Sequence, residues 1–418
     1  MKPLKICIDA RLVSGDAGGV EQFVIGLATG LSRLTDGSEE YYFLAYTDSK
    51  EWIIPFLDGP CQILEDSKFP RESVLRRIVK RSPGFVNLLH AINPLLFWRS
   101  IPQPKSNGLI ESAGIDVMHF TVQNAFRTEI PSIYHPHDLQ HIHLPDGFTL
   151  RRRVLRDQMY RAFCDQASMI ATASRFVKRD LIEQYQLAEE KIDVVPLAPV
   201  IDAYSEPGPE VLAGIRQKYS LPPDFIFYPA QTWPHKNHMG LLQALVILRD
   251  RFGVKMNAVF SGRKDDFFRT IEKQVRELGL EGQVNFLGFV STTELRGLYK
   301  LCRAVVIPTK FEAASFPLWE AFIMEAPVAC SNVTSLPEQA GDSALLFDPN
   351  KPEEIARQVF QLWTDDTIRS ALVEKGRRNV ARFSWERTAR IFRAHYRRIG
   401  RRALNDEDMN LLLSPSLL

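Results

Sequence analysis

The sequence predicts an α/β protein built from two doubly wound parallel sheets. Short apolar runs typical of buried strands alternate with segments whose apolar residues recur at helical spacing, which is the pattern of βαβ units. A proline-rich stretch divides this alternation into two halves of similar size. The length of 418 residues also exceeds one ordinary core and leaves room for two or three domains.

The first half opens with a strand at residues 6–8, followed by a glycine-bearing loop. Apolar residues from Val20 to Leu34 then recur at helical spacing and predict a helix. Ser174 can cap another helix that extends to Tyr185. Further strands are expected at residues 41–46, 117–120, 132–135, 169–172 and 194–195.

A cluster of helix-breaking residues interrupts the alternation after the last of these strands: Pro196, Pro199, Pro207, Gly208, Pro209, Pro222 and Pro223. We therefore place a first domain at residues 1–200, a linker at 201–220 and a second domain at 221–384. In the second domain, strands are expected at 225–228, 258–261, 284–287 and 304–307, with helices over 239–252 and 267–278 and another beginning near Pro317. An amphipathic helix follows over 385–403, and the tail at 404–418 is expected to be loose.

Composition excludes several classes of protein. Lysine and arginine exceed aspartate and glutamate by only 52 − 50 = 2, so the net charge gives no support to nucleic-acid binding. The five cysteines form no CxxC pair and their number is odd, which favours a reducing compartment over a disulfide framework. No apolar run is long enough for a signal peptide core or a membrane span, so a cytoplasmic location is expected.

An insertion at about residues 67–105 interrupts the first domain. Residues 71–105 of this insertion combine seven basic residues with one acid and a set of large apolar side chains. Such a mixture suits an anionic membrane surface or a lipid-linked substrate. The alternative is a helical insertion that packs on the sheet and keeps its charges solvated.

The segment from Ala304 to Ala321 has the strongest chemical pattern. A strand ends in a loop that bears Glu312, a tight turn of small residues follows, and the next helix carries Glu320 near its start. Free backbone N–H groups at the turn and helix N-terminus can bind an anion. Two flanking carboxylates can accept hydrogen bonds from hydroxyl groups, so the segment suits a phosphate flanked by polyols, as in a sugar nucleotide.

The spacing from Glu312 to Glu320 resembles the E-x7-E motif of retaining glycosyltransferases of the GT-B architecture, in particular glycosyltransferase family 4. The surrounding residues through Pro327 are also similar to the family pattern, and the resemblance covers about residues 5–400. Other segments agree with the family in the same order: 18–21, 137–139, 173–176, 228–237, 286–290, 335–338 and 383–385.

The resemblance implies roles for the second domain. Glu312 would bind donor sugar hydroxyls, Glu320 the ribose hydroxyls, and Lys236 the donor diphosphate. Amides of Ser315 and Phe316 would reach the sugar or phosphate. The family usually has an arginine where this sequence has Gln231. One positive charge that would contact the leaving group is therefore missing, and Arg263 is a candidate to supply it.

In the first domain, the resemblance implies that Gly18 and Gly19 let the loop and the following helix N-terminus approach the diphosphate. His137 would lie at the donor sugar, near the reacting centre. Four histidines crowd this region, namely His135, His137, His141 and His143, so a metal site is the alternative interpretation. The family resemblance argues against a metal or any other cofactor.

For the whole chain, the resemblance implies two Rossmann-like domains that face each other across a cleft. The first would bind the acceptor, the second would bind the nucleotide sugar, and the helix at 385–403 would cross back to the first. The expected reaction is transfer of a hexose with retention, with GDP-mannose favoured as donor over UDP- or other NDP-sugars. The expected acceptor is a saccharide, lipid-linked, in bacterial polysaccharide or O-antigen assembly at the cytoplasmic membrane face. A non-catalytic nucleotide-sugar-binding protein and another GT-B enzyme such as an epimerase are the alternatives.

Overall fold

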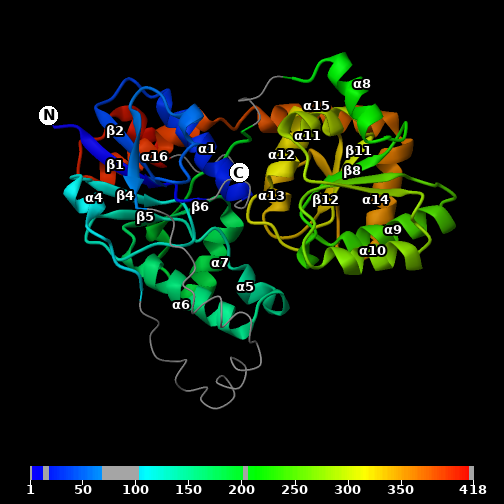
Figure 1. Ribbon diagram of the computed structural model, residues 1–418, viewed down its shortest axis with the longest axis horizontal. Coiled ribbons are helices and arrows are strands. Elements are labelled where there is room, and N and C mark those ends of the chain that lie inside the picture. Colours follow the sequence, from blue (N-terminus) through cyan, green and yellow to red (C-terminus); the bar gives the residue numbers. More distant parts are fainter. Residues whose placement is uncertain (1, 13–17, 68–102, 201–205, 414–418) are drawn as a thin grey trace, which may run out of the picture. The chain divides into compact units, whose positions relative to one another are not determined.

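The computed structural model describes residues 2–12, 18–67, 103–200 and 206–413, which fold into two compact units (Figure 1). The first unit combines the chain up to Thr172, residues 181–195 and the segment from Glu386 onward. The second unit comprises residues 173–180 and 196–385. Both ends of the chain therefore contribute to the first unit.

The described part of the first unit contains a seven-stranded parallel sheet, with strand order β3-β2-β1-β4-β5-β6-β7. The strands are β1 (Leu4–Asp9), β2 (Glu39–Tyr46), β3 (Cys61–Asp66), β4 (Val117–Phe120), β5 (Ser132–Tyr134), β6 (Met169–Thr172) and β7 (Ile192–Val194). The central strands β4, β5 and β6 are buried at every residue, as expected for a parallel sheet covered on both faces.

Helices of several lengths surround this sheet. Helix α1 buries Phe23, Leu27 and Leu31, which recur at helical spacing, so its apolar stripe faces the core. The helices are α1 (Gly19–Ser32), α4 (Leu109–Ser112), α5 (Gln140–His143), α6 (Leu150–Gln166), α16 (Trp385–Ile399) and α17 (Asp406–Leu413), with 3-10 turns η1 (Ile54–Phe56), η3 (Pro145–Gly147) and η4 (Glu189–Lys191). Helix α7 (Arg175–Tyr185) is divided, with residues up to 180 in the second unit and the rest in the first.

The described part of the second unit contains a six-stranded sheet with order β10-β9-β8-β11-β12-β13, again parallel throughout. Its strands are β8 (Ile226–Pro229), β9 (Ala258–Ser261), β10 (Val284–Gly288), β11 (Ala304–Ile307), β12 (Val328–Ser331) and β13 (Ala344–Phe347). Strands β9, β11 and β12 are fully buried, whereas the edge strand β10 is half-exposed along its length.

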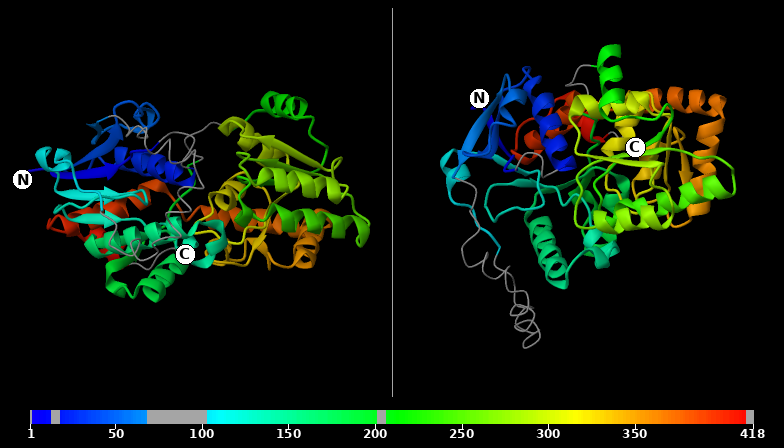
Figure 2. Two further views of the ribbon diagram at one scale, coloured as in Figure 1. Left: turned by 60° about the horizontal axis from the view of Figure 1, so that its bottom comes forward. Right: turned by 45° about the vertical axis from the view of Figure 1, so that its right-hand side comes forward.

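Helices cover both faces of the second sheet (Figure 2). Helices α9, α10 and α14 lie on one face, and α11, α12 and α13 on the other (Figure 1). The helices are α8 (Pro209–Lys218), α9 (His238–Asp250), α10 (Phe268–Glu277), α11 (Thr292–Leu301), α12 (Phe316–Ile323), α13 (Leu336–Ala340), α14 (Pro352–Thr364) and α15 (Asp366–Val380), with the 3-10 turn η6 (Pro234–Lys236).

The two doubly wound parallel sheets confirm the predicted fold class. The expected strands at 117–120, 169–172, 258–261 and 304–307 coincide with β4, β6, β9 and β11. The range predicted as a linker, 201–220, contains helix α8. The tail is not loose as expected, because it begins with helix α17. The insertion predicted at about 67–105 lies outside the described residues, except at 67 and 103–105.

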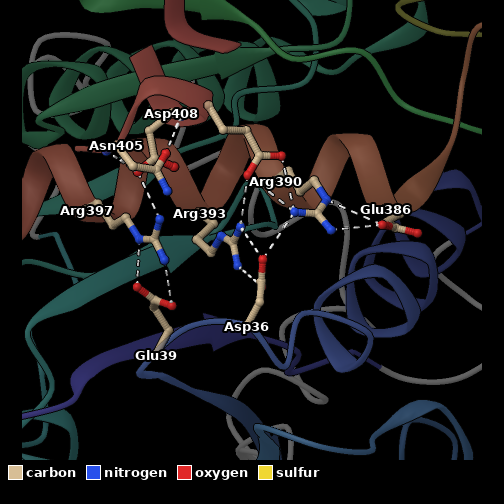
Figure 3. Close-up of polar contacts among 9 residues, drawn as sticks. Asp36, Glu39, Glu386, Arg390, Arg393, Arg397, Asn405 and Asp408 are labelled. Carbon is tan, nitrogen blue, oxygen red and sulfur yellow. Dashed lines mark hydrogen bonds and ion pairs between the residues drawn. The ribbon is translucent and has the colours of Figure 1, made fainter. Parts of the chain in front are cut away.

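Helix α16 joins the first unit through a row of arginines (Figure 3). Arg397 donates from Nε to Glu39 on β2 at 2.7 Å and from Nη1 to Asp408 on α17 at 2.9 Å. One turn earlier, Arg393 pairs with Asp36, and this hydrogen bond lowers the pKa of Asp36 to about 2. The arginines therefore fix both β2 and α17 to α16.

The apolar side of α16 completes the core of the same unit. The ring of Phe392 lies 6.2 Å from that of Phe23 on α1 and 4.8 Å from that of His119 on β4. His119 Nδ1 shares a 2.6 Å hydrogen bond with the hydroxyl of Tyr396. Burial lowers the pKa of His119 to about 3, so this histidine is neutral at physiological pH.

Arg397→Met is expected to lower the free energy of unfolding by about 3 kcal/mol, because it leaves two buried carboxylates unpaired. The side chains of Glu39 and Asp408 are only 6% and 1% exposed. Urea denaturation followed by circular dichroism measures the change. Arg398→Met is the control on the same helix, since its partner Asp193 is more exposed and the loss should stay below about 1 kcal/mol. Equal losses in the two variants would contradict a special role for the buried network.

Candidate active site

The strand order of the second unit creates a switch point between β8 and β11. Chain crossovers from these neighbouring strands lead to opposite faces of the sheet, so the loops after their carboxyl ends diverge. Ligands of open α/β sheets bind at such a point. Lys236 belongs to the loop after β8 and Glu312 to the loop after β11.

The loop after β8 is fixed by Asn237, which has a left-handed backbone conformation with φ 58°. Its side-chain oxygen accepts from the backbone N–H of Gly240 at 3.3 Å and caps α9. Its amide nitrogen donates to the carbonyls of Pro308 and Pro349 at 2.9 and 2.8 Å. The residue next to Lys236 is thereby tied to the loops after β11 and β13.

Lys236 and Glu312 form an ion pair, with Nζ and Oε1 separated by 2.5 Å. Both side chains are largely buried, at 19% and 12% exposed, so solvent screens the pair weakly. The backbone of Glu312 is held as well: its N–H donates to Thr334 at 3.0 Å, and its carbonyl accepts from the hydroxyl of Ser335 at 2.9 Å. The site therefore presents a fixed cation beside a fixed anion.

The turn before α12 uses one of its amides internally. The N–H of Ser315 donates to the side-chain oxygen of Gln339 at 2.8 Å, so this amide, expected to reach a sugar or phosphate, already has an acceptor. The hydroxyl of Ser315 and the amide nitrogen of Gln339 are buried, and within the described chain neither has a hydrogen-bond partner. Phe316 is buried at the start of α12.

Glu320 lies one turn into α12 and faces α11. The hydroxyl of Tyr299 donates to its Oε2 at 2.7 Å. Burial raises the pKa of Glu320, and the hydrogen bond from Tyr299 opposes this rise only in part. The carboxylate is thus held in a position where its charge costs free energy, which is common at functional sites.

Gln231 and Arg263 lie on two loops that are linked at the same sheet edge. The backbone N–H of Thr232 donates to the carbonyl of Arg263 at 3.2 Å, and the hydroxyl of Thr232 accepts from the N–H of Asp265 at 2.9 Å. Gly262, with φ 135°, allows this approach, because a Cβ there would lie 2.4 Å from the carbonyl oxygen of Ala230. Gln231 is half-buried and Arg263 is exposed.

The remaining predicted residues belong to the first unit. Gly18, with φ 52°, is the N-cap of α1, and Gly19 is its first residue. His137 follows β5 with φ 64°, and its Nε2 lies 2.7 Å from the carbonyl oxygen of Thr121. Burial lowers the pKa of His137, so its single N–H points to Thr121 and Nδ1 is left as an acceptor. A sugar hydroxyl would therefore have to donate to this ring.

In the histidine-rich region, the ring of His135 packs against other aromatic and imidazole rings. His135 lies 5.5 Å from His137, 5.0 Å from His119 and 4.9 Å from Phe23, measured between ring centroids. Across the described ranges, no group of three or more His, Cys, Asp or Glu side chains is arranged to hold a metal ion. The sequence did not predict a role for Tyr299 or Gln339, because nothing in their local sequence marks them as partners of Glu320 and Ser315.

Two models of known protein families match this chain. Residues 17–198 match the model described as "Glycosyltransferase Family 4", and residues 215–379 match the one described as "Glycosyl transferases group 1". The chain belongs to the family 4 glycosyltransferases. The two matches fall on the two sheets, and the second includes Gln231, Lys236, Arg263, Glu312 and Glu320.

Curated relatives of this glycosyltransferase include two from Escherichia coli. The O-antigen chain mannosyltransferase B is 31% identical over 60% of this chain and 63% of its own length. The serotype-specific mannosyltransferase WbdA is 29% identical over 58% of this chain and 31% of its own length. The aligned region thus spans less than two thirds of either relative.

Solved structures share the GT-B fold. A glycosyltransferase from Rickettsia africae superposes with a TM-score of 0.67 at 17% identity, covering 96% of this chain and 99% of the other. Anabaena HepE in complex with UDP and glucose superposes with a TM-score of 0.68 at 18% identity, covering 94% and 99%. At these identities the likeness establishes the architecture.

Glu320→Gln is expected to stabilise the glycosyltransferase at neutral pH. The folded-state pKa of Glu320 is raised, so the wild-type fold loses stability as the pH rises through that pKa, and the amide removes this loss. The gain should vanish below the unfolded-state pKa of about 4.3. Urea denaturation at several pH values measures it, with Glu281→Gln on an exposed turn as the control. A gain that does not depend on pH would contradict this origin.

Proposed function

We propose that this chain is a retaining glycosyltransferase that moves a mannosyl residue from GDP-mannose to a saccharide acceptor. The ion pair between Lys236 and Glu312 at the switch point is the observation that carries the proposal. An ammonium suits a diphosphate and a neighbouring carboxylate suits sugar hydroxyls, so together they suit the donor. On binding, the donor would replace their mutual contact with contacts to itself.

The proposed reaction exchanges one bond at the anomeric carbon for another. The bond to the diphosphate oxygen breaks, a bond to the acceptor hydroxyl forms on the same face, and the hydroxyl proton passes to the departing phosphate oxygen. Negative charge grows on the leaving diphosphate, and Lys236 would stabilise it. Gln231 can offer only an amide N–H at its position, so Arg263 on the linked loop is the proposed second cation.

The preference for GDP-mannose rests on the relatives, since several curated matches are named mannosyltransferases. UDP-sugars are the second choice, because HepE has been solved with UDP-glucose. We also propose that the reaction needs no metal. Lys236 would then stabilise the negative charge on the diphosphate, as a divalent cation does in other transferases.

The proposed acceptor is a lipid-linked saccharide in polysaccharide or O-antigen assembly. Two relatives are named for O-antigen chains, which supports this class. We place the reaction at the cytoplasmic membrane face, with peripheral attachment to an anionic surface. Over the ranges that the structure describes, no helix is both long and apolar enough to span a bilayer.

A panel of GDP-, UDP- and dTDP-sugars tests the proposal. GDP-mannose with a saccharide acceptor is expected to give acceptor-dependent product in EDTA, and NMR of the new linkage should show the anomeric configuration of the donor. Donor binding without transfer to any acceptor would favour the alternative of a non-catalytic binder. Conversion of the nucleotide sugar without acceptor would favour an epimerase. Loss of activity in EDTA would contradict the metal-free proposal.

Lys236→Ala is expected to lower kcat by about 10²- to 10³-fold, because a preorganised charge near the leaving group is lost. Lys300→Ala is the control, since Lys300 pairs with Glu206 at 2.7 Å in another part of the second unit and should leave kcat unchanged. Steady-state rates with saturating donor measure both. A Lys236→Ala enzyme with wild-type kcat would remove Lys236 from the chemistry.

A further inference from the structure

The first two turns of α6 carry a mixture of basic and apolar side chains, of which all but the half-buried Arg153 are exposed. We call it the α6 basic face, and it consists of Leu150, Arg151, Arg152, Arg153 and Leu155. Helix α6 packs beside α5 and against β5 in the first unit (Figure 1). All of these residues lie outside the groups assigned to the candidate site.

The three arginines form no ion pairs with the described residues. Arg151, Arg152 and Arg153 have no side-chain partner within the part of the chain that the structure describes. Later arginines of the same helix behave differently: Arg156 donates to Asp138 at 2.9 Å, and Arg161 pairs with Asp157 at 3.0 Å. Within the described residues, the arginines of α6 thus form ion pairs from its second turn onward and not in its first turn.

Helix stability does not account for these arginines either. They occupy the first turn, where the helix dipole disfavours cations, and no acid lies in that turn to offset them. Thr149 caps the helix through a side chain that accepts from the N–H of Arg152. The capping residue thus agrees with a helix start, whereas the charges oppose it, so neither capping nor the helix dipole accounts for the arginines.

Two leucines near these arginines are exposed to solvent. Leu150 is 73% exposed and Leu155 is 41% exposed. The exposed Met409 and Leu413 lie on α17, which begins with the exposed acids Asp406 and Glu407. Exposed apolar side chains meet a basic surround on α6 and an acidic one on α17.

We propose that the α6 basic face docks this chain on an anionic phospholipid surface. The arginines supply charge complementarity to phosphate headgroups, and the leucines can enter the boundary between headgroups and acyl chains. The link between Arg156 and Asp138 joins this helix to the loop that carries His137. Docking rests on the proposed function, since a lipid-linked acceptor is presented at such a surface.

Vesicle binding by the full-length chain tests the docking. Sedimentation with vesicles of phosphatidylcholine mixed with phosphatidylglycerol should retain the protein, and added salt should weaken the binding. The triple variant Arg151→Glu, Arg152→Glu and Arg153→Glu should bind at least about 100-fold more weakly, at roughly fivefold per basic residue. The new acids suit a helix N-terminus, so the variant should remain folded.

A matched triple variant reverses the same number of charges on α10: Arg269→Glu, Lys273→Glu and Arg276→Glu. It should bind vesicles like the wild type. The double variant Leu150→Ser and Leu155→Ser should weaken binding without changing the net charge, whereas Met409→Ser with Leu413→Ser should not. Equal losses of vesicle binding in the two charge-reversal variants would indicate that binding depends only on the net charge of the protein. That result would overturn the docking proposal.

Two further outcomes would also overturn it. One is equal binding of the wild type to pure phosphatidylcholine, and the other is full binding by the α6 triple variant, which would assign attachment to another segment. GDP binding and transfer to a soluble acceptor are measured on the same variants. The α6 triple variant should keep both, so a failure of docking is distinguished from a failure of the proposed function.

Discussion

The adjacency of β8 and β11 is the constraint on which the candidate site depends. Lys236 and Glu312 are 76 residues apart in the chain, yet their side chains meet because parallel strands end at the same edge of the sheet. Asn237 then links the loop after β8 to the loops after β11 and β13 through two buried hydrogen bonds. The sheet order, more than any single loop, sets the position of the ionic groups.

Polar groups at this edge are largely satisfied by the protein itself. Lys236 pairs with Glu312, the amide of Ser315 pairs with Gln339, and Glu320 accepts from Tyr299. A ligand would therefore exchange contacts with these groups, and its net affinity would depend on the difference between the old and the new contacts. Such internal pairing also keeps the groups in place before any ligand arrives.

Sequence reasoning succeeded where burial on both faces produces short apolar runs, as in β4, β6, β9 and β11. It missed the edge strands β3 and β13, whose positions are partly exposed, and also the fully buried strand β12. Because it did predict the half-exposed edge strand β10, exposure alone does not explain the missed strands. It also expected a loose tail, because the contact between Arg397 and Asp408 that holds α17 cannot be seen in local sequence. Family motifs located the loops of Lys236 and Glu312, whereas Tyr299 and Gln339 depend on tertiary contacts that no spacing reveals.

Because α16 belongs to the first unit, it affects the order in which the two units can be completed during synthesis. Phe392 and Tyr396 complete a core begun by Phe23 and His119, so the first unit lacks part of its interior until α16 has been synthesised. Domains commonly fold in order of synthesis. Here the second unit, completed by Trp385, has all its strands available earlier, so the half of the chain that is synthesised first is the last to be completed.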